Sequence, residues 1–242
     1  MSQFMDMIRL PNYGLGIAKG QFSDISHVHK FGATPEMSIN TTGTIWDVSD
    51  TLYPWSVWDS GASQLDIVCA SANDVGLTLH VFGLDSNYEL ISESTEVTSQ
   101  TGQTTTNSYI RVNRAYVTNT VTNEGNISLQ YSGTVVARLL AGQGQTLMAI
   151  YTVPENHTGY IVKGVSTCEA NSEGSGFFYA REFGLSTFRV QHSFEFGLGN
   201  QYDYHFTVPL KMPAKTDLDV RALVRSNNSR VTAAFDIILD ND

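Results

Sequence analysis

Histidines, carboxylates and glycines are the residues of this chain whose types and spacing could support chemistry. His27 and His29 are two positions apart, and residues at this spacing share one face of a strand, so they could supply half of a metal site. No third ligand lies nearby in the sequence, which favours ordinary polar residues. Asp85-x-Asn87-x-Glu89 resembles the start of a calcium loop, but Leu90 occupies the position that requires glycine, so we expect a hairpin turn.

Motifs for nucleotide binding and nucleophilic catalysis are absent from the sequence. Gly14-x-Gly16 and Gly197-x-Gly199 lack the third glycine of a dinucleotide fingerprint, and neither a P-loop nor a nucleophile elbow occurs. Carboxylates such as Glu93 lie in polar sequence, where solvated surface is the expected environment. We therefore expect no catalytic, cofactor-binding or metal-ligating residues and no enzyme. A glycoside hydrolase, which needs two convergent carboxylates, is the enzymatic alternative.

Composition and charge narrow the class of protein further. The formal net charge is −10 and the sequence pI is about 4.9, so nucleic acid and anionic membranes are not expected partners. The N-terminus lacks a basic start followed by an apolar block, and the apolar runs are too short to cross a bilayer. Cys69 and Cys168 are expected to be free, because two thiols in 242 residues do not form a disulfide framework.

The hydrophobic pattern predicts an all-β protein, an antiparallel β-sandwich or jelly roll. Charged residues make up 16% of the chain, and short alternating segments are separated by Gly, Pro, Asn and Ser. Tyr202, Tyr204, Phe206 and Val208 alternate with polar residues, and the pattern at 231–239 predicts an apolar C-terminal strand.

Three regions follow from this pattern. Residues 1–60 are expected to form an extended N-terminal arm and an aromatic segment, residues 61–140 a first β unit, and residues 141–242 a second, jelly-roll-like unit. A glycine-rich break at 141–145 marks the boundary between the two units. All three tryptophans fall between positions 46 and 58, which indicates either a local core or a contact patch.

Several segments, in their order along the chain, resemble a family of virion structural proteins of tailed bacteriophages, especially marine and cyanobacterial phages. The segments are His29-Lys30-Phe31-Gly32, Thr44-Ile45-Trp46-Asp47, Tyr53-Pro54, Ser71 to Asp74, Val81 to Tyr88, Ser108 to Val117, Gly144 to Pro154, Lys215 to Leu218, Arg221-Ala222 and Phe235 to Ile237. After Asp74 this chain runs directly into Val75-Gly76-Leu77, where the family continues through a Gly- and Thr-rich passage. The resemblance implies a particle component: a capsid cement or decoration protein, a head fibre or a tail part.

Our first hypothesis is a cement protein on the outer surface of the head, which binds the major capsid protein and itself, with a trimer ahead of a dimer. Aromatic residues are the usual anchors of such interfaces. The expected contact residues are Tyr13, Phe22, Phe31, Trp46, Tyr53, Trp55 and Trp58. The alternative is a tail or head fibre module that recognises host cell-surface glycan through Phe177-Phe178-Tyr179 or Tyr202-Asp203-Tyr204.

Overall fold

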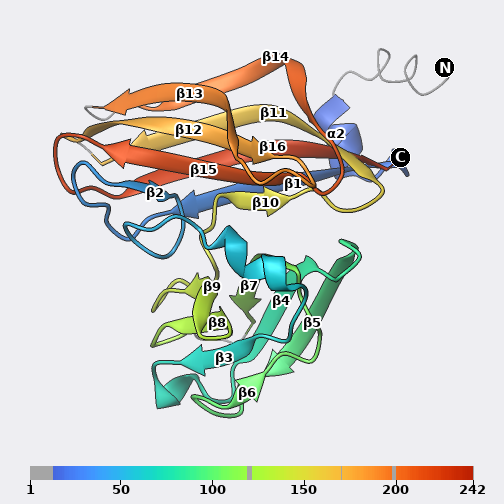
Figure 1. Cartoon of the computed structure of the whole chain (residues 1–242), viewed down its shortest axis with the longest axis vertical. Coiled ribbons are helices and arrows are strands. Elements are labelled where there is room, and N and C mark those ends of the chain that lie inside the picture. Colours follow the sequence, from blue (N-terminus) through green and yellow to red (C-terminus); the bar gives the residue numbers. More distant parts are fainter. Residues whose placement is uncertain (1–12, 119–121, 170, 198–199, 242) are drawn as a thin grey trace.

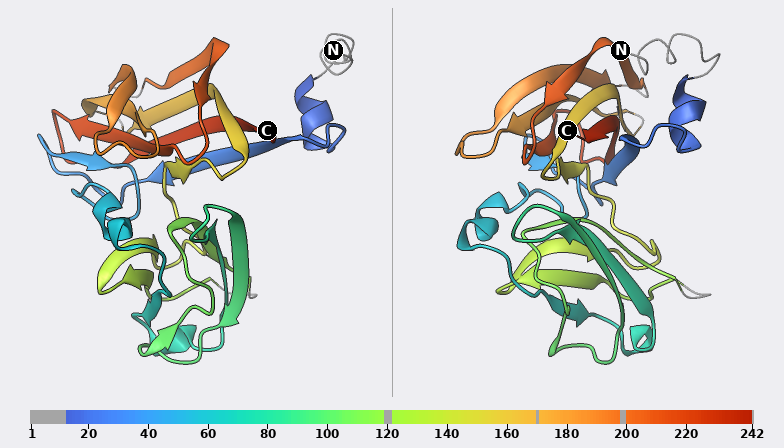
Figure 2. Two further views of the ribbon diagram at one scale, coloured as in Figure 1. Left: turned by 45° about the vertical axis from the view of Figure 1, so that its right-hand side comes forward. Right: turned by 90° about the vertical axis from the view of Figure 1, so that its right-hand side faces the viewer.

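The computed structural model describes residues 13–118, 122–169, 171–197 and 200–241, and it places two β units one above the other (Figure 1). In the two turned views of Figure 2 the units are again separate, and short connections join them. Each unit has a hydrophobic core of its own. The prediction of an all-β chain with antiparallel sheets is confirmed.

The upper unit consists of two packed antiparallel sheets. One sheet has the order β1 (Ile25–Ala33), β16 (Val231–Asn241), β11 (His157–Cys168) and β14 (Tyr202–Met212). The other has the order β10 (Ile150–Thr152), β15 (Asp217–Val224), β12 (Glu173–Arg181) and β13 (Arg189–Gly197). Strand β2 (Thr42–Thr44) pairs with β15 next to β10.

Strand β16 shows why the upper sheets form where they do. Val231, Ala233, Phe235, Ile237 and Leu239 are all buried, and the residues between them are half-buried. Successive side chains of a strand point to opposite faces, so this period of two directs these five apolar side chains into one core. The apolar C-terminal strand predicted from the sequence is confirmed.

The lower unit comprises two smaller sheets and short helical turns. Its strands are β3 (Asp66–Cys69), β4 (Thr78–Leu84), β5 (Leu90–Glu96), β6 (Gln103–Thr104), β7 (Arg111–Val117), β8 (Ile127–Tyr131) and β9 (Thr134–Leu139). They are ordered β6-β3-β8-β9 and β5-β4-β7. Two 3-10 helices, η1 (Trp55–Ser60) and η2 (Ala72–Asp74), lie along the connections.

The N-terminal region differs from the expected extended arm. Strand β1 pairs with β16 along its whole length, from Ile25 opposite Asp240 to Ala33 opposite Thr232. The long apolar strand β16 is paired on one side by β11 and needs a second neighbour, which the N-terminal segment supplies. The upper unit is therefore built from both ends of the described chain, and the lower unit is inserted between β2 and β10. Helix α2 (Tyr13–Ala18) lies against β1, and residues 1–12 of the expected arm lie outside the described residues.

Several smaller expectations can be compared with the described residues. Asp85 turns the chain between β4 and β5, because its carboxylate accepts the backbone N–H groups of Asn87 and Glu89, so the expected hairpin turn is confirmed. Cys69 and Cys168 are free thiols, one in each core. None of the helices in the described part of the chain is long and apolar enough to span a membrane.

Candidate functional site

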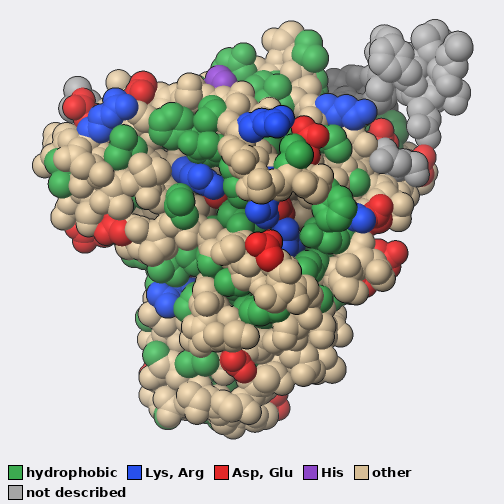
Figure 3. Space-filling model, viewed as in Figure 1, with side chains coloured by type: hydrophobic (Ala, Val, Ile, Leu, Met, Phe, Trp, Pro, Cys, Tyr) green, Lys and Arg blue, Asp and Glu red, His purple; other side chains and the backbone are tan. Residues whose placement is uncertain are grey.

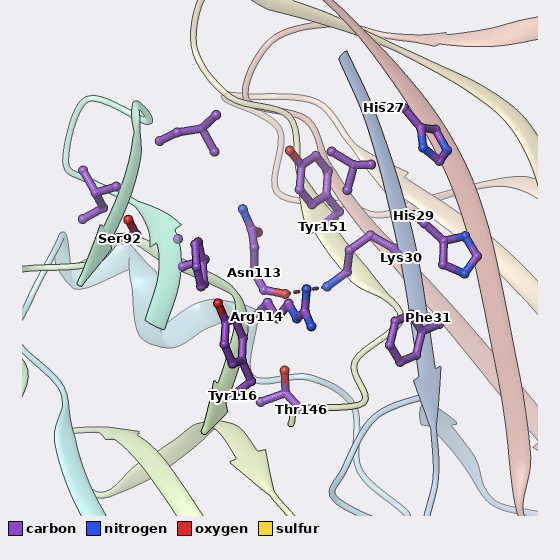
Figure 4. A pocket seen from close by; sticks show the side chains of 15 residues that line it. His27, His29, Lys30, Phe31, Ser92, Asn113, Arg114, Tyr116, Thr146 and Tyr151 are labelled. Carbon is purple, nitrogen blue, oxygen red and sulfur yellow. Dashed lines mark hydrogen bonds between the residues drawn. The ribbon is translucent and has the colours of Figure 1, made fainter. Parts of the chain in front are cut away.

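A cleft of about 510 Å³ lies between the two units. Strand β1 and Tyr151 of β10 form its upper wall, and β4, β5 and β7 form its lower wall (Figure 4). Clefts of this size accommodate small ligands, and they occur preferentially where two domains meet.

Lys30 of β1 extends into the cleft, although only 7% of the residue is exposed. Its ammonium group donates a hydrogen bond to the backbone carbonyl of Asn113 on β7. Burial lowers the pKa of Lys30 to about 7; the positive charge of Arg114 acts in the same direction, and Asp47 acts against it. Lys30 is therefore a buried amine that is close to losing its proton at neutral pH.

Arg114 approaches Lys30 from the lower wall, and Figure 4 shows the two side chains pointing toward one another. The Arg114 guanidinium carbon lies 4.8 Å from the centroid of the Tyr116 ring, and the group donates a hydrogen bond of 2.9 Å to Oε1 of Gln145. Arg114 is exposed to solvent, whereas Lys30 is not. Two cationic side chains thus meet in the cleft.

Asp47, which acts on Lys30 through its charge, is completely buried. Burial raises the pKa of Asp47 to about 8, despite the Leu147 N–H that donates to its Oδ2 atom at 2.7 Å and despite the charge of Lys30. Its Oδ1 atom has no hydrogen-bond partner among the described residues. Because a carboxyl group with a pKa near 8 is mostly protonated at pH 7, Asp47 leaves the two cations of the cleft largely uncompensated.

A second group of buried charges joins the units through Asp217 of β15. Arg111 of β7 donates two hydrogen bonds to the Asp217 carboxylate, at 2.8 and 3.0 Å, and Arg181 of β12 donates to the same carboxylate at 2.7 Å. Thr152 adds a hydroxyl donor at 2.6 Å. Burial lowers the pKa of Arg111, but the hydrogen bonds and charge of Asp217 outweigh it, so the pKa is raised.

Asp219, two positions further along β15, extends this group. Its carboxylate accepts hydrogen bonds from the Thr44 hydroxyl, the Trp55 indole and Arg221, each at 2.9 Å. We call the five charged residues Arg111, Arg181, Asp217, Asp219 and Arg221 the ionic cluster. Figure 3 shows lysine and arginine side chains spread over the upper unit, whereas few charges appear on the lower unit in the same view.

The seven aromatic residues expected to contact a capsid lie in different environments. Trp46, Tyr53, Trp55 and Trp58 are 2 to 6% exposed and pack in one core, so they have almost no surface to offer a partner. Their rings pack edge to face. The centroid of the Tyr53 ring lies 5.1 Å from that of Trp46 and 4.7 Å from that of Trp55. These four expectations are corrected to core positions.

The other three expected contact residues are more peripheral. Phe31 is half-buried and lines the cleft, and Phe22 is half-buried in the connection between α2 and β1. Tyr13 begins helix α2, and its side chain lies outside the described part of the structure.

His27 and His29 share a face of β1, as the sequence predicted, and both contact one carboxylate. Asp236, on the paired strand β16, lies 3.0 Å from His27 Nε2 and 2.6 Å from His29 Nδ1. Both rings lie on the side of β1 away from Lys30 (Figure 4). Within the described residues, no group of three or more His, Cys, Asp or Glu side chains is arranged to hold a metal ion.

A set of apolar and aromatic side chains lies on β13 and β14, the edge strands of the two upper sheets, and three of them, Val190, Tyr204 and Val208, are exposed while the others are half-buried. We call it the outer-edge patch, and it consists of Val190, His192, Phe194, Tyr202, Tyr204, Phe206 and Val208. Val208 is 78% exposed, Val190 50% and Tyr204 43%. The rings of Tyr202 and Tyr204 are within 7° of parallel, and those of Phe194 and Tyr202 within 11°.

The outer-edge patch includes Tyr202-Asp203-Tyr204, one of the two segments that the sequence suggested for glycan binding. Phe177-Phe178-Tyr179, the other, lies on β12 with Phe178 buried and its two neighbours half-buried. Tyr204 is exposed in the outer-edge patch, whereas Phe82 and Phe183 are exposed elsewhere in the described part of the chain.

Sequence reasoning did not identify Lys30, Asp47 or Arg114 as parts of a site. Lys30 and Asn113 are 83 positions apart, and scattered single cations carry no spacing signal. The segment around Lys30, Val28-His29-Lys30-Phe31, is half polar and gives no sign of a buried amine.

Comparisons with known proteins leave the function open. No family model matches the sequence, and neither does any curated protein. Among solved structures, that of the Gx strain of infectious bursal disease virus has a TM-score of 0.26 and 8% identity over 74% of this chain, which spans 55% of the viral chain. The structure of the Gt strain has a TM-score of 0.20 and 8% identity over 90% of this chain and 77% of the other. Likeness at this level says nothing about function.

Proposed function

We propose that this chain is a virion structural protein and, more specifically, a cement or decoration protein on the outer surface of a tailed-phage head. The strand order of the upper unit carries the proposal. When β1 and β10 to β16 are numbered one to eight along the chain, one sheet runs 1-8-3-6 and the other 2-7-4-5. This order supports a jelly roll, a fold that viral capsid proteins and lectins share.

The inserted lower unit is consistent with a particle component that has two functional ends. It extends from the upper unit on the side opposite to β13 and β14 (Figure 1). The ionic cluster joins it to the upper unit through Arg111 and Asp217 and fixes the orientation of the two. One unit can then dock on the shell while the other projects from it.

In place of the buried tryptophans, we assign the contact with the major capsid protein to the outer-edge patch. Exposed apolar surface that is contiguous usually marks an interaction site, and aromatic residues supply most of the anchors in such sites. Because β13 and β14 are edge strands, the same surface is suited to contacts between copies of this chain, for which we favour a trimer over a dimer.

The copy number of the protein in purified phage particles tests this function. Quantitative mass spectrometry should return a ratio to the major capsid protein that is one or a simple fraction. Absence of the protein from particles would overturn the virion role, and a handful of copies per particle would overturn the cement role.

Substitutions in the outer-edge patch test the assigned surface. We expect Val208→Thr combined with Tyr204→Thr to abolish binding of the purified protein to particles that lack it, because both side chains are exposed apolar surface. Val75→Thr is the matched control, since Val75 is 43% exposed on the lower unit. Binding of the double variant at the level of the control would exclude the patch as the contact.

A fibre module that recognises host glycan is the second candidate, and one observation favours it. The nearly parallel rings of Phe194, Tyr202 and Tyr204 are stacked next to the imidazole of His192. Aromatic faces with neighbouring hydrogen-bonding groups suit a sugar ring. Binding of the protein to host cells that is lost in Tyr204→Thr, together with a low copy number in particles, would favour this function over the first.

A further inference from the structure

We propose that the cleft between the two units binds a small ring compound that carries a carboxylate, with the carboxylate paired to Lys30 and Arg114. The inference is independent of the virion role. It begins with the approach of two cations, one on β1 and one on β7, whose side chains point toward one another across the cleft (Figure 4). Like charges at such a position are unfavourable unless an anion joins them.

The charge around the cleft favours an anion in spite of the acidic chain. Among the described residues that line it, none is Asp or Glu, whereas Lys30 and Arg114 are present. The formal net charge of the whole chain is −10, so the cleft is a local exception. Asp47 faces Lys30 from the connection after β2, but its buried carboxyl group is mostly protonated at neutral pH.

The walls of the cleft suit a ring as the body of the ligand. The rings of Phe82 and Tyr116 on the lower wall are stacked at 5.6 Å and 15°. Such faces pack against an aromatic ring or against the apolar face of a sugar. Ser92 and Thr146 also line the cleft, and their hydroxyl groups can bond to substituents of the ring.

Protonation of Lys30 links binding to pH. A bound carboxylate favours the charged amine, so above the Lys30 pKa of about 7 binding must take up a proton and becomes weaker. The other titratable groups around Lys30 are Arg114, Asp47, Tyr116 and Tyr151. Burial raises the pKa of Tyr151, which therefore stays neutral. His27 and His29 contact Asp236 on the far side of β1.

A titration of the intact protein followed by NMR tests the proposal. The probes are sodium glucuronate and sodium benzoate, with glucose and benzyl alcohol as uncharged controls at equal ionic strength. We expect at least one carboxylate to shift the amide signals of Lys30, Asn113 and Arg114, with affinity roughly tenfold or more above its uncharged control. The stronger probe tells whether a sugar acid or an aromatic acid is preferred. Lack of shifts with both carboxylates, or equal affinity for the uncharged compounds, would overturn the proposal.

Variants separate the two cations from an effect on folding. Arg114→Gln replaces an exposed side chain and should lower carboxylate affinity roughly tenfold while the rest of the spectrum is unchanged. Lys30→Met should also lower the carboxylate affinity. In addition, it should remove the weakening of binding at alkaline pH. Lys211→Gln, on the exposed part of β14, is the control and should bind as the unmodified protein does. Unchanged affinity in Arg114→Gln would contradict the inference.

Discussion

The two units are joined at two places where charges are buried, and these places differ in how the charges are paired. In the ionic cluster, Asp217 accepts hydrogen bonds from Arg111, Arg181 and Thr152, so both its oxygens are occupied. In the cleft, Lys30 has one backbone acceptor, and Asp47, which is buried outside the lining of the cleft, has an oxygen without a partner among the described residues.

The pKa shifts express the same difference. Asp217 raises the pKa of Arg111 despite its burial, whereas burial lowers the pKa of Lys30 to about 7 and raises that of Asp47 to about 8. A paired buried charge keeps its ionised form, and an unpaired one moves toward its neutral form. We infer that the ionic cluster holds the units together, while the cleft retains unused binding capacity.

The largest effect is expected from Asp217→Ala. Removal of this carboxylate leaves the buried Arg111 and Arg181 without their counter-ion, which should lower the free energy of unfolding by about 3–5 kcal/mol. Denaturation in urea measures the loss. Asp203→Ala breaks a more exposed pair with Lys163, 3.6 Å apart, and should cost about 1 kcal/mol or less. Similar losses in both variants would show that the ionic cluster does not join the units.

Lys30→Met should have the next largest effect, in the opposite direction. Between the folded pKa of about 7 and the ordinary value of 10.5, the unfolded chain binds more protons than the native protein, so the free energy of unfolding rises with pH. The variant should be about 1–3 kcal/mol more stable at pH 7, after the loss of the bond to Asn113, and should lack this rise. Urea denaturation across the pH range measures the gain in stability and its dependence on pH. A variant that is less stable than the unmodified protein would show that the buried Lys30 does not destabilise the fold. Lys211→Met is the matched control, with no change expected.

Asp47→Asn should have a smaller effect on stability that depends on pH in the opposite sense. Between 3.8 and about 8 the native protein binds more protons than the unfolded chain, so the free energy of unfolding falls as pH rises through this window. Asparagine retains an acceptor for the Leu147 N–H and cannot ionise, so the variant should lack the fall and gain about 1 kcal/mol near pH 8. Thermal unfolding at a series of pH values measures this difference in stability. If stability fell with pH in the variant as it does in the unmodified protein, the fall would not come from Asp47.

The smallest effect on stability is expected from Arg114→Gln, the variant that should lose carboxylate binding. Because Arg114 is exposed, its replacement should change the free energy of unfolding by about 0.5 kcal/mol or less. A large destabilisation would mean that Arg114, like Arg111, has a structural role, and the contrast between the two regions would disappear.

Strand pattern alone determined much of the secondary structure. The alternation at 231–239 predicted β16, and the turn residues Asp85 to Asn87 predicted the hairpin between β4 and β5. The alternation from Tyr202 to Val208 also predicted a strand, because period two is a local property of the backbone.

Burial and long-range pairing were decided only by the tertiary structure. The same alternation that buries Ile237 leaves Val208 78% exposed, because β14 is an edge strand and β16 is central. The tryptophan segment could have been core or contact surface, and packing against the lower unit made it core. The sequence carries no local signal that Lys30 meets Asn113 and Arg114, or Arg111 meets Asp217, since these pairs depend on how the two β units pack against each other.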